Sequence, residues 1–262
     1  MCGWVPCHPN TAGPKVKHSA LQIHMTVRSR LFVLLDANVL SAYLVPQSHS
    51  RKRNGKYLLH SRIEKLVRFA KRNNIFLYIP NFVIAEVFGT LAKYRYGRWN
   101  KHVKRNLPKC LVDREYWKLR DKFSKQIHNA RIFYHYELSR YHVLSCDLIS
   151  PIDHYYQFNR ARTKQVFVSP MRTFDHLILA MGIHLVRIHE RDSVVILTGD
   201  NRIADIARRS QTIPAASAKK LGLTVTARWL GLTWTPDIYP KVLNLGKSKK
   251  TEMLNTLGMD LD

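Results

Sequence analysis

Four short apolar runs, separated by stretches of helical spacing, constrain the fold of this chain more than any other feature. The runs are LFVLL (31–35), IFLYIP (75–80), YHVLS (141–145) and VVILT (194–198). Continuous apolar runs of this length are typical of strands that are buried on both faces of a parallel sheet. Because helical patterns lie between them, we predict an α/β fold, namely a three-layer α/β/α sandwich with a central, mostly parallel sheet.

The segments between the runs place apolar residues on one helical face, or open with residues that commonly begin helices. We expect helices over residues 37–45, 58–73, 81–91, 114–139, 151–162, 173–188 and 201–209. The segment LTVTARWLGLTW (223–234) reads as one or two late edge strands, because it is rich in β-branched and aromatic residues.

Four acidic residues stand at comparable places along this pattern. Asp36 ends the first run and Asp200 follows the fourth, whereas Glu86 and Asp175 lie within or near the start of helical segments. In an open parallel sheet, ligands bind beyond the carboxyl ends of the strands, so Asp36 and Asp200 would face one opening if their strands are neighbours. Close carboxylates repel one another, and a divalent cation with oxygen ligands relieves that repulsion. The pattern therefore predicts a metal site.

Each acid also has a simpler interpretation. Asp36, Asp175 and Asp200 are each suited to cap the helix that follows. Glu86 lies among apolar neighbours in its helical segment, and a charge on a buried face needs a cation as its partner. The joint pattern, rather than any single acid, indicates the site.

The chain is strongly basic, with a formal net charge of +25 and a pI of about 10.2. Such a charge favours a polyanionic partner, with nucleic acid ahead of a membrane surface. No apolar run approaches the ~20 residues of a membrane span. We expect no membrane partner. A merely soluble basic protein is the alternative reading of the charge.

The segment from Lys93 to Lys125 contains twelve Lys or Arg residues but only three acids, and aromatic residues are interspersed among them. Cations beside stacking rings are typical of single-stranded nucleic-acid binding. The cations named as candidate contacts are Arg95, Arg98, Lys101, Lys104 and Arg105. A solvated helical hairpin whose rings pack inward is an equally good interpretation.

The remaining organisation is one domain with extensions. We expect residues 1–27 to be an unstructured extension, with Met25 as an alternative start, and residues 236–262 to be a basic, polar tail. The domain then spans 28–235, with a basic helical insertion at about 95–140. The four cysteines lack CxxC spacing, so they indicate neither a zinc site nor a disulfide framework, and Cys2, Cys7 and His8 form an incomplete ligand set. Without an export signal, a cytoplasmic location is expected.

The order LLDANVL, VIAEV, TFDHLILAMG and VILTGDNRIADIA resembles the PIN-domain nucleases, which include toxin-type ribonucleases and RNA-processing endonucleases. The resemblance spans about residues 31–232 and includes the four acidic positions of the family in order. It implies that Asp36, Glu86, Asp175 and Asp200 are the catalytic residues and that they bind Mg²⁺ or Mn²⁺.

Around these acids, the resemblance places four supporting residues, which are Asn38, Thr198, Asn201 and Asp205. One position departs from the family: the residue two after the last aspartate is often acidic, but here it is Arg202. Because of that departure, the sequence does not decide whether a second metal ion binds. Asp205, one turn later, faces either the site or solvent. His176, which follows Asp175, either contacts the site or packs within its helix.

The implied function is a metal-dependent endoribonuclease that hydrolyses RNA phosphodiester bonds, either free-standing or as the toxin of a toxin–antitoxin pair. A carboxylate-bound ion lowers the pKa of a water molecule and neutralises charge on the leaving oxygen. Two alternatives stay open: a structure-specific DNA nuclease of the same fold, and a non-catalytic nucleic-acid-binding protein associated with an RNP or the ribosome. The resemblance also allows a homodimer and an antitoxin or RNP partner.

Overall fold

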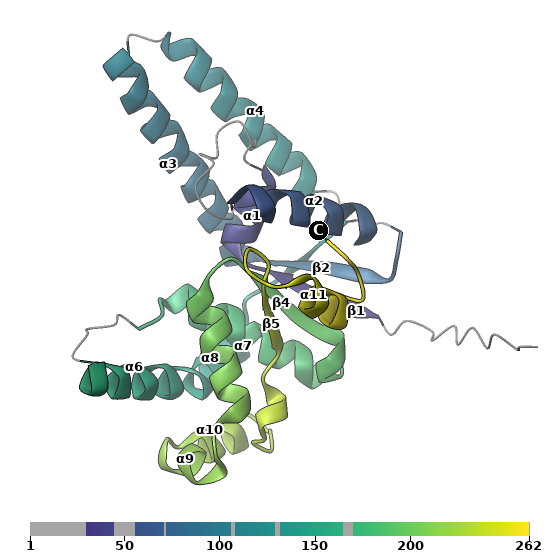
Figure 1. Ribbon diagram of the computed structural model, residues 1–262, viewed down its shortest axis with the longest axis vertical. Helices are drawn as coiled ribbons and strands as arrows, with labels where there is room; N and C mark the ends of the chain where they lie inside the picture. Colours follow the sequence, from purple (N-terminus) through teal and green to yellow (C-terminus); the bar gives the residue numbers. More distant parts are fainter. Residues whose placement is uncertain are drawn as a thin grey trace, which may run out of the picture.

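The structure is a computed structural model that describes residues 30–44, 56–70, 72–105, 108–128, 132–164 and 170–261. Its centre is a five-stranded parallel sheet with the strand order β3-β2-β1-β4-β5 (Figure 1). The strands are β1 (Leu31–Leu35), β2 (Ile75–Pro80), β3 (Phe133–Tyr136), β4 (Val194–Thr198) and β5 (Lys241–Asn244). The expected extension at 1–27, including Cys2, Cys7 and His8, lies outside the described residues.

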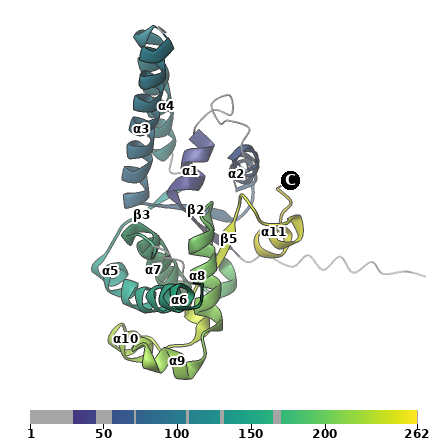
Figure 2. The ribbon, with the colours of Figure 1, turned by 60° about the vertical axis from the view of Figure 1, so that its left-hand side comes forward.

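Helices cover both faces of this sheet, with α1 to α4 on one side and α5 to α8 on the other (Figure 2). The helices are α1 (Ala37–Leu44), α2 (Lys56–Ala70), α3 (Asn81–Arg105), α4 (Lys109–Ile127), α5 (Arg140–Ser145), α6 (Ser150–Lys164), α7 (Thr173–Ile188), α8 (Asn201–Thr212), α9 (Ala215–Lys220), α10 (Leu223–Trp229) and α11 (Lys250–Leu257). The predicted three-layer α/β/α sandwich is therefore confirmed.

The direction in which strands are added to the sheet reverses between β1 and β4. The chain first builds outward from β1 to β2 and β3, and then returns across the sheet to add β4 and β5 on the other side of β1. β4 is buried along its whole length and β1 from Phe32 onward, as their continuous apolar sequences require. A reversal of this kind opens a crevice at the carboxyl ends of the two central strands.

Two of the expected strands are helices instead. YHVLS (141–145) lies in α5, where the ring of His142 accepts a hydrogen bond from the Ser139 backbone N–H, so that local capping overrides the apolar run. Residues 223–229 form α10, which begins after Gly222 in a left-handed conformation and buries Leu223, Thr226 and Ala227. Packing of residues three to four positions apart outweighs the β propensity of Thr and Val here.

The third strand lies inside a region expected to be helical. The predicted helix over 114–139 ends at Ile127 in the structure, and Phe133–Tyr136 then pairs with β2 as the edge strand β3. Four residues carry too little periodicity to distinguish a strand from the end of a helix.

Residues 236–261 are part of the domain, so the predicted tail over 236–262 is wrong for the part described. This segment supplies β5 and α11 and buries Tyr239, Met253, Leu257 and Leu261 in the core. Its apolar residues are too widely spaced in the sequence to signal a core segment, and they become buried only because β4 offers β5 a free edge.

The basic insertion is a helical hairpin that projects from the body of the domain (Figures 1 and 2). α3 begins beside the sheet at Asn81 and runs without a break to Arg105, and α4 returns alongside it. Ion pairs join the two helices, because Arg95 contacts Asp113 and Arg98 contacts Glu115. Although α3 has 25 residues, neither it nor any other described helix combines the length and apolar character needed to cross a membrane.

We predict that alanine substitution has opposite effects at two helical glycines. A Cβ at Gly182 would lie 2.7 Å from Ile196 Cδ1 and 2.7 Å from Pro240 Cγ, whereas a Cβ at Gly89 meets nothing within 4 Å. Overpacking costs about 1–3 kcal/mol, and Gly→Ala in a helix gains up to ~1 kcal/mol. Gly182→Ala should therefore lower the free energy of unfolding by about 1–2 kcal/mol, and Gly89→Ala should raise it. Urea denaturation measures both, and equal stabilisation of the two variants would contradict the close packing of α7.

Candidate active site

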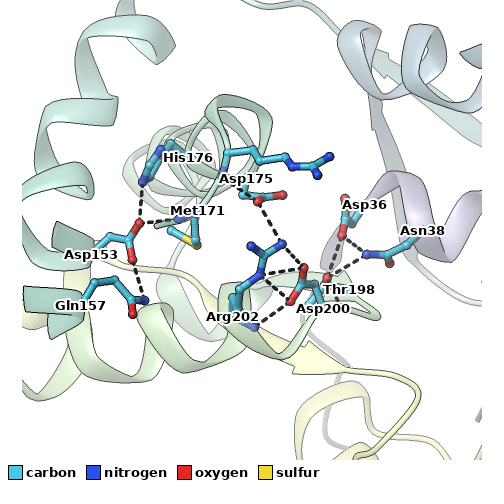
Figure 3. A network of polar contacts seen from close by, with 11 residues as sticks. Asp36, Asn38, Asp153, Gln157, Met171, Asp175, His176, Thr198, Asp200 and Arg202 are labelled. Carbon is cyan, nitrogen blue, oxygen red and sulfur yellow. Dashed lines mark hydrogen bonds and ion pairs between the residues drawn. The ribbon is translucent and has the colours of Figure 1, made fainter. Parts of the chain in front are cut away.

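Asp36 lies at the carboxyl end of β1, at the point where the strand order reverses (Figure 3). Its side chain is buried, with 7% of its surface exposed. Oδ1 accepts a hydrogen bond of 2.7 Å from the Ala37 backbone N–H, and Oδ2 accepts bonds of 2.7 Å from both Asn38 Nδ2 and Thr198 Oγ1. These donors hold the carboxylate in one orientation.

Asn38 and Thr198 join the ends of β1 and β4. Thr198, which is fully buried, donates to Asp36 and accepts a 2.9 Å hydrogen bond from the Asp200 backbone N–H. Asn38 Oδ1 accepts a 2.6 Å hydrogen bond from the Gly199 N–H. A Cβ at position 199 would come within 3.1 Å of that oxygen, so glycine permits the close approach. The two predicted supporting residues therefore lie beside Asp36.

Asp200 and Asp175 face the same opening as Asp36, and the guanidinium of Arg202 lies between them (Figure 3). Asp200 caps α8 by accepting the Arg202 backbone N–H, and its Oδ2 lies 2.9 Å from Arg202 Nη2. The same Nη2 lies 3.9 Å from Asp175 Oδ2, which also accepts the Arg172 backbone N–H at 2.9 Å. One cation thus bridges two of the four predicted acids.

The two sides of the opening differ in their electrostatics. Burial, with a smaller contribution from the charges of Asp175 and Glu86, raises the pKa of Asp36 to about 6 against the pull of its hydrogen bonds. Burial would also raise the pKa of Asp200, but the hydrogen bonds from Arg202 outweigh it and lower the pKa. Among the described residues, no Lys or Arg side chain forms an ion pair with Asp36.

Glu86 differs from its sequence interpretation. Its side chain, on α3, is exposed rather than enclosed in an apolar face, because α3 packs through Phe82, Val83, Val87 and Leu91 instead. It nevertheless lies near the other acids, since partial burial and the charge of Asp175 raise the pKa of Glu86. The four predicted acids are therefore connected. The charges of Asp175 and Glu86 act on Asp36, and Arg202 joins Asp175 to Asp200.

Arg172 is a residue of this opening that the sequence analysis did not identify. It precedes α7, and its charge opposes the rise in the pKa of Glu86 and adds to the lowering of the pKa of Asp200 by Arg202. The available signal was a basic residue directly before the TFD sequence of residues 173–175.

The chemistry of the opening suits a divalent cation on one side only. Asp36 offers a buried carboxylate without a cationic partner among the described residues, and hard oxygen ligands of this kind suit Mg²⁺ or Mn²⁺. Asp200 is already neutralised by Arg202. Within the ranges described, no three His, Cys, Asp or Glu side chains stand as a formed metal-ligand cluster. By donor chemistry alone, Asp36 is the acid suited to an ion, and the charges of Asp175 and Glu86 act on it.

Three other predicted residues lie away from this opening. Asn201 and Asp205 line a separate groove between α8, β5 and α11, where Asn201 accepts a hydrogen bond from Asn244 and Asp205 pairs with Arg208 at 3.2 Å. His176 turns toward α6, and its Nε2 lies 3.3 Å from the fully buried Asp153 (Figure 3). Helical periodicity directs consecutive residues of α7 and α8 to different faces, which explains these placements.

The basic insertion has both kinds of aromatic residue that were considered for it, rings packed inward within a hairpin and exposed rings that could stack on bases. Tyr94 and Tyr116 are half-buried within the hairpin, whereas Tyr96 and Trp117 are 68% and 46% exposed. Arg95 and Arg98 are engaged by acids of α4, so they stabilise the hairpin. The side chains of Lys101, Lys104 and Arg105 lie outside those that the structure describes.

Comparison of the chain with known protein families and with curated protein sequences found no match. The resemblance to PIN-domain nucleases therefore depends on the residues and geometry of this chain alone.

Asp36 should make stability depend on pH. Its pKa is raised from 3.8 to about 6 in the folded protein, so its favourable contribution is complete below pH ~4 and is lost as the pH rises through ~6. The shift corresponds to about 3 kcal/mol. In EDTA, Asp36→Asn should therefore gain about 3 kcal/mol relative to wild type between pH ~4 and ~7. Urea denaturation across that range measures the difference, with Asp205→Asn as a control on an acid whose side chain is 49% exposed. Parallel pH profiles of Asp36→Asn and wild type would contradict the buried charge.

Proposed function

We propose that this chain is a PIN-like, metal-dependent endoribonuclease that hydrolyses RNA phosphodiester bonds at the Asp36 opening. The observation that carries the proposal is a buried carboxylate at the reversal of strand order, with two further acids near enough to raise its pKa. Structural acids are rarely buried without a cation, whereas metal-binding acids commonly are. The opening itself is acidic and would repel RNA, but the large positive net charge of the chain attracts it.

Five residues of the opening have a role in this proposal. Asp36 would hold Mg²⁺ or Mn²⁺ together with Glu86 and Asp175, and the bound ion would supply a polarised water molecule and charge neutralisation. Asn38 and Thr198 fix the Asp36 carboxylate through their hydrogen bonds. Such supporting contacts commonly change metal affinity or activity by about 10–100-fold.

The hairpin supports single-stranded RNA as the substrate. Trp117 is 46% exposed, and the Arg120 guanidinium lies 4.9 Å from the centre of its ring, so a cation and a stacking surface stand together. Rings of this kind bind bases by stacking, and adjacent cations bind phosphates. The proposal includes a cytoplasmic location and allows a toxin role with an antitoxin partner.

One observation favours a second candidate, a nucleic-acid-binding protein without catalysis. Among the described side chains, no three potential metal ligands are already assembled around a common point. A chain that binds RNA through its basic surface would not need them.

The two candidates differ in a cleavage assay. With Mn²⁺ and single-stranded RNA, the wild type should cleave and EDTA should stop it, whereas Asp36→Asn should lower the rate on the order of 100-fold or more, since several kcal/mol of charge stabilisation are lost. Asp205→Asn is the matched control, because Asp205 lies in the separate groove, and it should retain the wild-type rate. A parallel reaction on DNA tests the structure-specific DNA nuclease. Absence of metal-dependent cleavage of either polymer would leave the binding protein.

Binding of RNA by the hairpin is tested separately from cleavage. In the Asp36→Asn background, Trp117→Ala should weaken binding of single-stranded RNA by about 5–150-fold, which corresponds to the ~1–3 kcal/mol of one base stack. Trp229→Ala is the matched control, because Trp229 is 77% exposed on α10, at the opposite end of the molecule from the hairpin (Figure 1). Fluorescence anisotropy measures both, and equal loss in the two variants would exclude a specific role for the hairpin.

A further inference from the structure

The four acids of the opening are unequally compensated by the protein's own cations. Arg202 contacts Asp200 at 2.9 Å and reaches Asp175 at 3.9 Å, both through Nη2. Its Nε also lies 3.3 Å from Asp200 Oδ2, so the guanidinium meets that carboxylate through two nitrogens. Asp36 receives only neutral donors among the residues described.

The position of Arg202 is that of a bridging cation. Two carboxylates from different elements, the start of α7 and the cap of α8, converge on one positive group between them (Figure 3). A divalent ion bound by both acids would occupy similar space, and the guanidinium would repel it at this distance. Arg202 also has a pKa raised mainly by its hydrogen bond to Asp200, so it stays charged.

The charges of the opening leave room for one ion. Five carboxylates, the four predicted acids and Asp153, face three cations, which are Lys93, Arg172 and Arg202. Two negative charges then stay uncompensated, which is the charge of a single divalent cation. Among the acids of the opening that the structure describes, the one that receives only neutral donors is Asp36.

We propose that Arg202 takes the place of a second metal ion, so that the opening binds one divalent cation beside Asp36 and keeps a permanent cation between Asp175 and Asp200. This inference rests on the proposed function for the first ion. Because Arg202 is 40% exposed, its guanidinium is also accessible to a substrate phosphate. The enzyme would need only one ion to place two cations at the reacting phosphate.

The experiment counts ions without any substrate. Mn²⁺ binding to the full-length chain is measured at neutral pH by calorimetry and by the electron paramagnetic resonance of free Mn²⁺. The number of ions bound by Asp36→Asn is subtracted from the number bound by each other protein, so that ions bound outside the opening do not count. The wild type should bind one Mn²⁺ by this measure. Arg202→Ala should bind a second ion, because Asp175 and Asp200 lose their bridging cation.

Matched variants separate the specific effect from a general loss of positive charge. Arg208→Ala removes an arginine from the same helix, six positions later, where it pairs with Asp205 outside the opening, so it should still bind one ion. Arg202→Lys keeps a charge and should also bind one ion. Arg202→Gln is neutral, is close to arginine in length and should bind two; it replaces Arg202→Ala if thermal melting shows that the alanine variant is unfolded.

Two failures are distinguishable. Two ions in the wild type, or one ion of unchanged affinity in both Arg202→Ala and Arg202→Gln, would overturn the role of Arg202 and leave the proposed nuclease intact. No ion in the wild type, with Asp36→Asn indistinguishable from it, would overturn the metal-dependent function and this inference together.

Discussion

Parallel pairing of β1 with β4 is the interaction on which the candidate site depends. Leu35 lies in register with Leu197, so the next residues of both strands emerge side by side at the same edge of the sheet. The Asp36 backbone N–H donates to the Leu197 carbonyl, and Asn38 accepts from Gly199 across the junction. The chain adds β2 and β3 on one side of this pair and β5 on the other, and such a reversal places a crevice at the carboxyl ends of the two strands. The position of the opening is thus a property of topology.

Charge compensation divides this opening into two unlike parts. On the side of α8, an arginine of the chain neutralises Asp200, and the pair resembles an ordinary structural ion pair. On the side of β1, a carboxylate is buried with only neutral hydrogen-bond donors described around it, which is an unfavourable arrangement until a cation is present. Burying Asp36 therefore costs free energy, which the packing of the two buried central strands offsets. The two halves of the opening thus differ in whether the protein itself supplies the positive charge.

The acids were easier to locate from the sequence than the residues around them. Asp36 and Asp200 follow apolar runs that form neighbouring strands, as predicted, because burial on both faces leaves a clear pattern in such strands. Glu86 was expected within an apolar face but lies exposed, since the orientation of α3 is fixed by its packing and not by its composition. Asp205 and Asn201 were expected near Asp200, yet the turn of α8 directs them into another groove. Spacing along a helix gives relative faces, but only the neighbouring elements decide which face meets the site.

The sequence by itself determined the three strands β1, β2 and β4, the layered α/β arrangement, and the places where Asp36 and Asp200 leave the central strands, because those features follow from local apolar periodicity. Tertiary structure alone decided that residues 133–136 and 241–244 become edge strands, since each short segment gains its hydrogen bonds only from a strand distant in sequence. It also decided that Arg202 stands between Asp175 and Asp200. That contact joins residues of two separate elements, and no local pattern encodes the distance between them.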